Sequence, residues 1–277
     1  MPELPEVETV RRGLAPALEG RRIRKVDVIR RDLRTPVPGG FEQRVTGRRI
    51  ERVSRRAKYL LLELSGGGAI LCHLGMSGKL FVVKGSTPRV LKKHDHVVIF
   101  FEGGRQLVFN DIRRFGIMDF LERGAEDPDP RLSLLGPEPL GNALSAPSLG
   151  KVLGKRRGAI KPSLLDQRLV AGLGNIYASE ALFRAGISPR RKCCNISTGQ
   201  AERLVAAIRD VLCEAIEAGG SSLRNFTGAD GEPGYFQHRF RVYGRAGLAC
   251  QTVGCRGVVK QITQAGRSTF FCGRCQG

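Results

Sequence analysis

The order of hydrophobic and polar positions predicts a helix near the start of the chain. The helix covers residues 5–18, with Pro5 in its first turn, where the missing backbone N–H is tolerated. Apolar side chains recur along one face at helical spacing. This face, which we expect to pack on a core, consists of Val7, Val10, Leu14 and Leu18.

Short apolar runs follow, rich in Val, Ile, Leu and Phe and separated by glycine. The runs are AKYLLLEL, GAILCHL, KLFVVK, DHVVIFF, RQLVFND and GIMDFLE. Runs of this length and composition are typical of β-strands. The glycines at 66–68 and 103–104 favour hairpin turns between them. We therefore predict an α+β protein whose first half is a helix and a two-layered antiparallel sandwich.

The second half of the chain has a helical pattern. Residues 136–150 are rich in Pro, Gly and Ser, so they are predicted to form an interdomain linker. A capping-box spacing at 197–200 precedes a long apolar-periodic run that stops at Gly219. Residues 221–234 form a polar, glycine-rich loop, and long loops in compact domains are often functional. The predicted domains are 1–135, 151–243 and 244–277.

The strong positive charge of the chain indicates which kind of partner it binds. The formal net charge is +20, and charge of this density usually meets phosphate. The basic residues are scattered as pairs, which indicates a folded charged surface rather than a disordered tail. A membrane surface is the rival partner, but we find no basic amphipathic helix or lipidation motif. No apolar stretch has membrane-spanning length and no signal peptide is present, so we expect a cytosolic protein.

Four of the eight cysteines lie close together near the end of the chain. The pairs Cys250 with Cys255 and Cys272 with Cys275 can place four sulfurs around one ion. Four thiolates are typical of structural zinc, although a rubredoxin-type iron site uses the same ligands. A small segment with little apolar content needs such a staple to fold. The other cysteines, expected to be core or incidental thiols, are Cys72, Cys193, Cys194 and Cys213.

The segment between the two cysteine pairs, VVKQITQAGRSTFF, is predicted to be a β-hairpin. Its turn lies at or near residues 264–266, which places Arg267 close to the tip. A rigid cationic hairpin on a basic protein favours a contact with phosphate or with a nucleic-acid groove. The alternative is an arginine that is merely solvated.

Several stretches together resemble the bacterial formamidopyrimidine-DNA glycosylases. The resemblance runs from Met1 to Cys275, in the family's order. It implies a helix and β-sandwich, then a helix-two-turn-helix domain, then a zinc finger, with damaged double-stranded DNA in the cleft between domains. The stretches that carry it are PELPEVE, RRAKYLLLEL, HLGMSGKL, NDIRRFG, AIKPSLLDQ, AGLGNIYASEALF, DGEPGYF and the four-cysteine terminus.

The resemblance implies a bifunctional enzyme that excises a damaged base and then cuts the sugar by β- and δ-elimination. Its nucleophile is an N-terminal proline, which corresponds to Pro2 after removal of Met1. A free prolyl nitrogen is a secondary amine that can attack the sugar and form an iminium ion. Glu3 corresponds to the acid that protonates the opening sugar ring. The reacting centre needs no metal, so one structural zinc ion is the expected cofactor.

The resemblance also assigns residues to DNA binding. Lys58 corresponds to a lysine that binds the phosphate beside the lesion and assists elimination, although a surface lysine is the ordinary alternative. His73, Asn175 and Arg267 correspond to residues that clamp phosphates around the extruded nucleotide. For His73 alone, a satisfied core histidine is the competing interpretation. Lys161 corresponds to another lysine of the DNA-binding surface, with no contact specified.

A base inside the duplex must be flipped out before it can be excised, which leaves a hole in the stack. Met76, Arg113 and Phe115 correspond to residues that fill it. Methionine and phenylalanine can wedge between bases, and Arg113 can hydrogen-bond the orphaned cytosine. Core positions are the alternative for Met76 and Phe115. The loop at 221–234 corresponds to the segment that closes over the flipped base.

Two further acids lie in the predicted first helix. Glu6 corresponds to a second carboxylate near the active site, but an anion that stabilises the helix N-terminus explains it nearly as well. Glu8 is expected to lie on the surface.

Two rival functions remain. The endonuclease VIII-like glycosylases excise oxidised pyrimidines with the same nucleophile, but they usually begin PEGPE, and Leu4 departs from that pattern. A non-enzymatic protein that binds damaged DNA could share the fold, but the presence of Pro2, Glu3 and Lys58 argues against it. We expect a monomer. The preference between 8-oxoguanine and ring-opened purines stays open.

Overall fold

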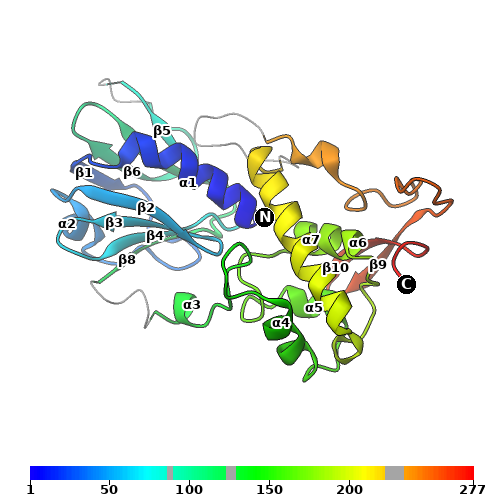
Figure 1. Ribbon diagram of the computed structural model, residues 1–277. Helices are drawn as coiled ribbons and strands as arrows, with labels where there is room; N and C mark the ends of the chain where they lie inside the picture. Colours follow the sequence, from blue (N-terminus) through cyan, green and yellow to red (C-terminus); the bar gives the residue numbers. More distant parts are fainter. Residues whose placement is uncertain (86–89, 123–128, 222–233) are drawn as a thin grey trace. The chain divides into compact units, whose positions relative to one another are not determined.

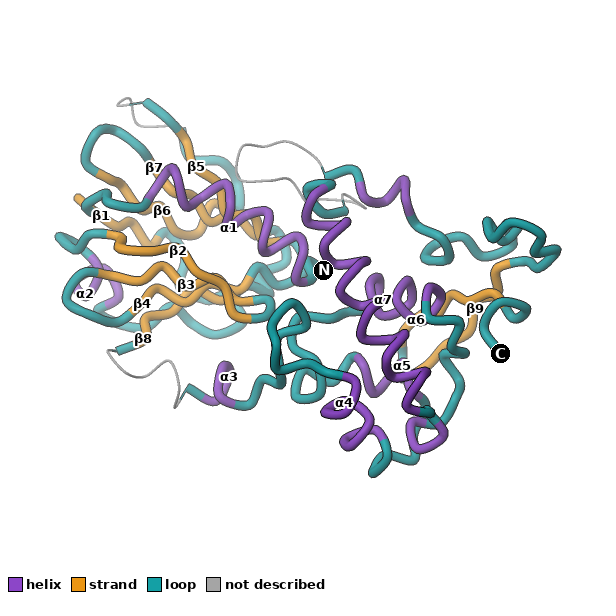
Figure 2. Tube along the Cα trace, viewed as in Figure 1, coloured by secondary structure: helices purple, strands orange, loops and turns teal. Residues whose placement is uncertain are grey.

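The computed structural model describes most of the chain, namely residues 1–85, 90–122, 129–221 and 234–277. These residues form two compact units. Unit 1 comprises Met1–Ser133 and Ala218–Tyr235, and unit 2 comprises Leu134–Glu217 and Phe236–Gly277. Strands dominate unit 1 and helices dominate unit 2 (Figure 2). Among the described residues, no helix combines the length and the apolar character needed to cross a membrane.

Unit 1 begins with helix α1 (Leu4–Leu18), as predicted, although the helix starts one residue before Pro5. Glu3 is its N-cap, and Glu3 and Glu6 form a capping box in which each side chain accepts a backbone N–H of the other residue. The predicted apolar face is buried and packs into the core of this unit.

Two four-stranded antiparallel sheets follow α1 in unit 1 (Figure 1). In spatial order, the first contains β2 (Ile50–Arg56), β3 (Tyr59–Leu64), β4 (Ala69–His73) and β8 (Ile117–Leu121). The second contains β1 (Ile23–Val28), β6 (Asp95–Phe101), β7 (Gln106–Asp111) and β5 (Gly78–Val83). Side chains of both sheets and of α1 share one hydrophobic core, which confirms the predicted sandwich. The short helices of this unit are α2 (Phe41–Val45) and α3 (Pro130–Ser133).

Both glycine turns in the sandwich are confirmed. Residues 66–68 connect β3 to β4, and residues 103–104 connect β6 to β7. Every glycine in these turns has a positive φ, which side chains with a Cβ rarely adopt.

Strands β1 and β2 were not among the predicted strands. Their sequences, IRKVDV and IERVSRR, each have only two buried apolar residues. Each strand lies at the edge of its sheet, where one face is solvated. Charged residues on an edge strand also oppose pairing with other chains, so such strands do not need a strongly apolar sequence.

The described part of unit 2 contains four α-helices and one hairpin. Helix α7 begins at the predicted capping box, since the N–H of Gln200 donates to Ser197 Oγ at 3.3 Å and the N–H of Ser197 donates to Gln200 Oε1 at 3.1 Å. Between α6 and α7 lies the 3-10 turn η1 (Cys193–Asn195), and after residue 235 lies η2 (Phe236–Arg239). The helices are α4 (Ala146–Leu153), α5 (Ile160–Leu164), α6 (Asn175–Arg184) and α7 (Thr198–Glu217).

Residues 136–150, predicted to be an interdomain linker, fall within unit 2. From Ala146 onward they belong to α4. Before that helix, the Arg209 guanidinium of α7 donates to the carbonyls of Pro139, Gly141 and Leu144 at 3.3, 3.2 and 2.7 Å. Proline and glycine interrupt regular structure here, but side-chain donors from α7 bind the freed carbonyls. The predicted domain limits at 135, 151 and 243 stay predictions.

The hairpin of unit 2, formed by β9 (Val259–Gln264) and β10 (Arg267–Cys272), is anchored through aromatic rings. Tyr243 lies 5.0 Å from Phe270 on β10 and 5.6 Å from Phe240, measured between ring centroids. Phe270 packs with Val242 and Val259 in a small apolar cluster. This cluster gives the hairpin a core of its own on one face.

A buried carboxylate fixes the segment that leads to this hairpin. Glu180 of α6 is fully buried and accepts three backbone N–H groups. Its Oε2 accepts from Arg241 at 2.9 Å, and its Oε1 accepts from Val242 at 3.0 Å and from Tyr243 at 2.8 Å. Because residues 241–243 lie outside the strands of the described structure, the carboxylate takes the place of a strand partner.

Glu180→Gln tests this anchor. The amide places an N–H donor against a backbone N–H donor, so we expect a loss of about 2 to 3 kcal/mol in the free energy of unfolding. Urea denaturation measures it. Glu214→Gln is the matched control, because Glu214 pairs with Arg184 at a partly exposed site and should cost less than about 1 kcal/mol. Equal effects of the two substitutions would contradict the anchor.

Candidate active site and nucleic-acid interface

The N-terminal residues are buried rather than frayed. Pro2 and Glu3 are both buried directly in front of α1. The Glu6 carboxylate holds them there, because its Oε2 accepts the Glu3 N–H at 2.8 Å. Its Oε1 accepts from the N–H of Ser221 at 2.8 Å and from Ser221 Oγ at 3.0 Å. Glu6 therefore caps the helix and also ties the N-terminus to the residue that precedes the segment 222–233.

Glu8 does not lie on the surface, so that expectation was wrong. It is buried, and its carboxylate binds the guanidinium groups of Arg11, Arg12 and Arg55 at 2.8, 3.0 and 3.1 Å. Burial opposes the charged form, but hydrogen bonds and charge from these arginines outweigh it and lower the pKa of Glu8. The three arginines around its carboxylate explain how Glu8 can be buried although it carries a charge.

Arg55 links this cluster to Lys58. Besides Glu8, its guanidinium binds the carbonyl of Ala57 at 2.9 Å. Ala57 and Lys58 form the two-residue turn between β2 and β3, and Ala57 has a φ of 53°. Lys58 is buried, so it is not the ordinary solvated lysine of a strand surface. Sequence reasoning missed Arg55, because the pair of Arg55 and Arg56 was counted only as charge.

His73 ends β4 beside this turn. It pairs with Tyr59 in the ladder, and the two ring centroids lie 4.9 Å apart. Its Nδ1 accepts the Gly75 N–H at 3.0 Å, which puts the ring proton on Nε2. Burial and the charges of Lys58 and Arg34 lower the pKa of His73 to about 4. The ring is thus neutral near pH 7 and offers an N–H donor without charge.

Met76, Arg113 and Phe115 lie on two turns of unit 1. Met76 and Phe115 are 43% and 40% exposed, so neither is a core residue. The Arg113 guanidinium lies 4.6 Å from the centroid of the Phe115 ring, in cation–π geometry. Together, Met76 and Phe115 present apolar side chains to solvent, and Arg113 adds a positive charge beside them.

Lys161 is not on the surface in this structure, although it was expected on the DNA-binding surface. It is 0% exposed. Its ammonium donates to Asn175 Oδ1 at 2.5 Å, to the carbonyl of Ser268 at 3.0 Å and to Thr269 Oγ1 at 2.7 Å. Asn175, the first residue of α6, also donates to the Ser268 carbonyl at 2.9 Å. Lys161 thus joins α5, the start of α6 and strand β10.

Arg267 is exposed at the start of β10, as the predicted hairpin requires. Ala265 and Gly266 form the turn, with φ values of 47° and 71°. Two successive residues at positive φ are typical of the tight hairpin turn whose twist matches that of the strands. The turn therefore places Arg267 directly beside the tip.

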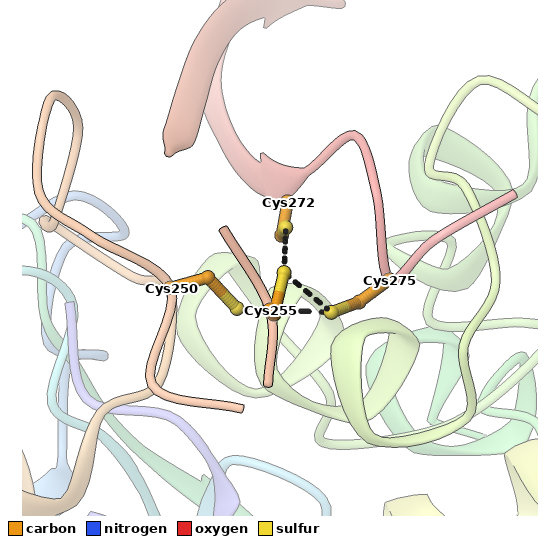
Figure 3. A group of neighbouring side chains, drawn as sticks. All are labelled: Cys250, Cys255, Cys272 and Cys275. Carbon is orange, nitrogen blue, oxygen red and sulfur yellow. Dashed lines mark hydrogen bonds between the residues drawn. The ribbon is translucent and has the colours of Figure 1, made fainter. Parts of the chain in front are cut away.

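The four clustered cysteines converge beside the hairpin (Figure 3). All four sulfur atoms lie within 4.8 Å of one another. The Sγ–Sγ distances are 3.4 Å from Cys275 to Cys255, 3.7 Å from Cys250 to Cys275 and 3.8 Å from Cys255 to Cys272. A tetrahedron with zinc–sulfur bonds of about 2.3 Å has sulfur–sulfur edges of about 3.8 Å. The thiols are thus spaced for one tetrahedral ion.

Family models match most of the chain. They are the formamidopyrimidine-DNA glycosylase N-terminal domain over residues 1–118, the H2TH domain of the same glycosylases over 135–227, and a zinc finger found in FPG and IleRS over 247–277. The formamidopyrimidine-DNA glycosylases of Cereibacter sphaeroides (strain ATCC 17029 / ATH 2.4.9) and Ruegeria pomeroyi are 55% and 54% identical over 282 residues, covering 100% of both chains in each comparison. The chain belongs to the formamidopyrimidine-DNA glycosylase family.

Solved structures of the glycosylase family agree with this fold. The MutM (Fpg) protein of Thermus thermophilus has a TM-score of 0.88 and 44% identity, covering 100% of this chain and 99% of that one. The Lactococcus lactis Fpg in complex with DNA containing an abasic site has a TM-score of 0.89 and 36% identity, covering 99% of each chain. The order of sandwich, helix-two-turn-helix domain and zinc finger is therefore confirmed.

The zinc-finger match and the four-cysteine cluster together assign one structural zinc ion to this glycosylase-family chain. The rubredoxin-type alternative has no such support. Of the loop at 221–234, only Ser221 and Gly234 are among the described residues, so the expected contact with a flipped base lies outside them.

Cys272→Ser tests the metal centre. Loss of one thiolate should reduce bound zinc from one ion per chain to a small fraction, because structural zinc and the fold of its module are coupled. Elemental analysis of the purified chain measures it. Cys213→Ser is the control, since Cys213 is exposed and outside the cluster, and it should keep its zinc. A full zinc content in the Cys272 variant would contradict the assignment.

His73→Gln tests the neutral imidazole. In the folded chain its pKa is about 4, and in the unfolded chain about 6.5. Between these two values the unfolded chain binds more protons at His73 than the folded chain does. The contribution of His73 to the free energy of unfolding is therefore highest above pH 6.5 and is lost as the pH falls toward 4. The slope attributable to this group is at most about 1.4 kcal/mol per pH unit.

Urea denaturation at several pH values should show a shallower slope for His73→Gln than for the unsubstituted chain. The exposed His238 supplies a control, and His238→Gln should leave the slope unchanged. Identical slopes in all three chains would show that His73 is not held neutral.

Proposed function

We propose that this chain is a DNA glycosylase and abasic-site lyase of base-excision repair that removes oxidised purines from duplex DNA. Its substrates are 8-oxoguanine and formamidopyrimidines. The observation that carries the proposal is the buried Pro2–Glu3 pair at the capped start of α1, in a chain that belongs to the glycosylase family over its whole length.

Pro2 is the proposed nucleophile. With Met1 attached, its nitrogen is a tertiary amide without a free lone pair, so Met1 has to be removed. A free α-amino group titrates at about pH 7.7 to 8.0, so a fraction of the protein molecules has a neutral amine near pH 7. The amine attacks C1′ of the damaged nucleotide, the bond from C1′ to the base breaks, and the base leaves with the proton of the amine. The C1′–O4′ bond then breaks as the sugar ring opens, which leaves an iminium ion between Pro2 and C1′. This ion accepts electrons as the 3′ and 5′ phosphates are eliminated.

Glu3 is the proposed acid that protonates the sugar ring oxygen as the ring opens. Its burial supports this role, because a carboxyl group shielded from water transfers its proton within the site. Glu6 holds the backbone of Glu3 through its N–H, so we assign Glu6 to positioning rather than to proton transfer. Lys58 is proposed to bind the phosphate beside the lesion and to assist elimination.

Phosphate binding is proposed for His73, Asn175 and Arg267. The neutral ring of His73 suits a hydrogen bond from Nε2–H. Asn175 and the start of β10 are held by Lys161, so Lys161 acts through them instead of reaching DNA itself. The partner is damaged double-stranded DNA, as in the Lactococcus lactis relative, and we propose that the protein acts as a monomer.

Met76, Arg113 and Phe115 are proposed to fill the space that the extruded base leaves. Exposed apolar side chains can enter a base stack, and a guanidinium can hydrogen-bond the unpaired cytosine. This assignment, together with Leu4, favours purine lesions over the oxidised pyrimidines of endonuclease VIII-like enzymes.

Excision assays on duplexes with 8-oxoguanine or thymine glycol test the proposal. We expect excision of 8-oxoguanine opposite cytosine to exceed that of thymine glycol. Glu3→Gln should still bind the duplex but lose at least about 100-fold in single-turnover excision. Glu51→Gln, at an exposed position on β2, is the control and should retain activity. Faster excision of thymine glycol would favour the pyrimidine enzyme, and binding without any excision would favour a damage-binding protein.

A further inference from the structure

Two neighbouring turns of unit 1 present apolar side chains to solvent. One turn, residues 74–77, connects β4 to β5, and the other, residues 112–116, connects β7 to β8. The exposed fractions of Met76, Ile112 and Phe115 are 43%, 54% and 40%. Neighbouring apolar side chains that stay exposed are typical of an interaction surface, so the contacts that hold these two turns decide how that surface is presented.

A single buried carboxylate contacts both turns. Asp111, the last residue of β7, is 0% exposed. Its Oδ1 accepts from Ser77 Oγ at 2.5 Å and from the Arg113 N–H at 3.2 Å, and its Oδ2 accepts from the Gly116 N–H at 2.8 Å. The Arg113 N–H also donates to Ser77 Oγ at 3.0 Å. Asp111 and Ser77 therefore bind both turns to each other.

The two backbones also touch directly. A Cβ on Gly75 would lie 2.5 Å from the carbonyl carbon of Phe115, so only glycine fits there. Arg114 has a φ of 57°, a left-handed conformation that residues with a side chain rarely adopt. Hydrogen bonds to Asp111 from the residues on both sides of Arg114 hold it in place. The close backbone contact and the hydrogen bonds to Asp111 together restrict the two turns relative to each other.

We propose that Asp111 and Ser77 are positioning residues that preorganise Met76, Arg113 and Phe115 for entry into the base stack. The inference rests on the proposed function of this chain as a glycosylase that extrudes bases. Both residues are buried, so they act through the turns and not by touching DNA. A wedge that is rigid before binding loses less conformational entropy when it displaces a base.

If Asp111 and Ser77 have this positioning role, their effect on the excision rate depends on whether the damaged base is paired. A base paired within a duplex has to be unstacked, whereas a base in a mismatched bubble is already largely free. A preformed wedge should therefore matter for the first substrate and little for the second. A residue that only stabilised the fold would affect excision from both substrates equally.

Single-turnover excision by the full chain, with 8-oxoguanine either paired with cytosine or in a bubble, tests this. Ser77→Ala should lower excision from the paired duplex by about 10- to 100-fold and excision from the bubble by less than about threefold. Both rates come from the same preparation, so a smaller folded fraction lowers both and leaves their ratio unchanged. Asp111→Asn should change the ratio in the same direction.

Ser65→Ala is the matched control. It removes a hydroxyl that accepts the Arg49 N–H at 2.9 Å, on the turn between β3 and β4 and so at the other end of β4 from residues 74–77, and should leave the ratio unchanged. An equal loss on both substrates, or no loss with Ser77→Ala and Asp111→Asn, would overturn the positioning role. Absence of excision by the unsubstituted chain on both substrates would instead refute the proposed function.

Discussion

Buried carboxylates that accept backbone N–H groups hold the irregular segments on which this protein depends. Glu6 accepts from Glu3 and Ser221, Asp111 accepts from Arg113 and Gly116, and Glu180 accepts from residues 241–243. Segments outside helices and sheets lack the regular backbone partners of those elements, and an unpaired buried N–H destabilises the fold. An ionised carboxylate can accept several such donors at once, and each bond is stronger than one between neutral groups. In this strongly basic protein, three buried carboxylates thus hold three irregular segments.

Two of these carboxylates lie beside residues assigned to chemistry or DNA contact, and the third holds the segment that leads to the zinc hairpin. Glu6 fixes the backbone next to Pro2 and Glu3, Asp111 fixes the turns with Met76 and Phe115, and Glu180 fixes the approach to the zinc hairpin. In unit 2 a buried cation acts in the same way, since Lys161 joins Asn175 to β10. The arrangement separates two tasks. Buried charges set the geometry, while Met76, Phe115 and Arg267 stay exposed, and such preorganisation is what catalysis requires.

Much of the fold could be predicted from the sequence because it follows local patterns. Helix α1, the apolar strands, the glycine turns and the zinc hairpin each have a periodicity, a turn residue or a ligand spacing of their own. The errors concern residues whose environment is set by distant segments. Strands β1 and β2 are charged edge strands, Glu8 is buried by three arginines, and Lys161 is enclosed by β10. No local pattern reports such tertiary partners, and Asp111 was missed for the same reason.

The central claim is that the amine of Pro2, held at the capped start of α1, is the nucleophile. Borohydride trapping of the processed chain on a duplex with 8-oxoguanine, followed by peptide mapping of the covalent adduct, tests it most directly. We predict that the DNA is attached to the N-terminal peptide through Pro2, and that protein with Met1 verified as retained forms no adduct. An adduct on Lys58 or on another lysine, or equal trapping by the chain that keeps Met1, would contradict the account.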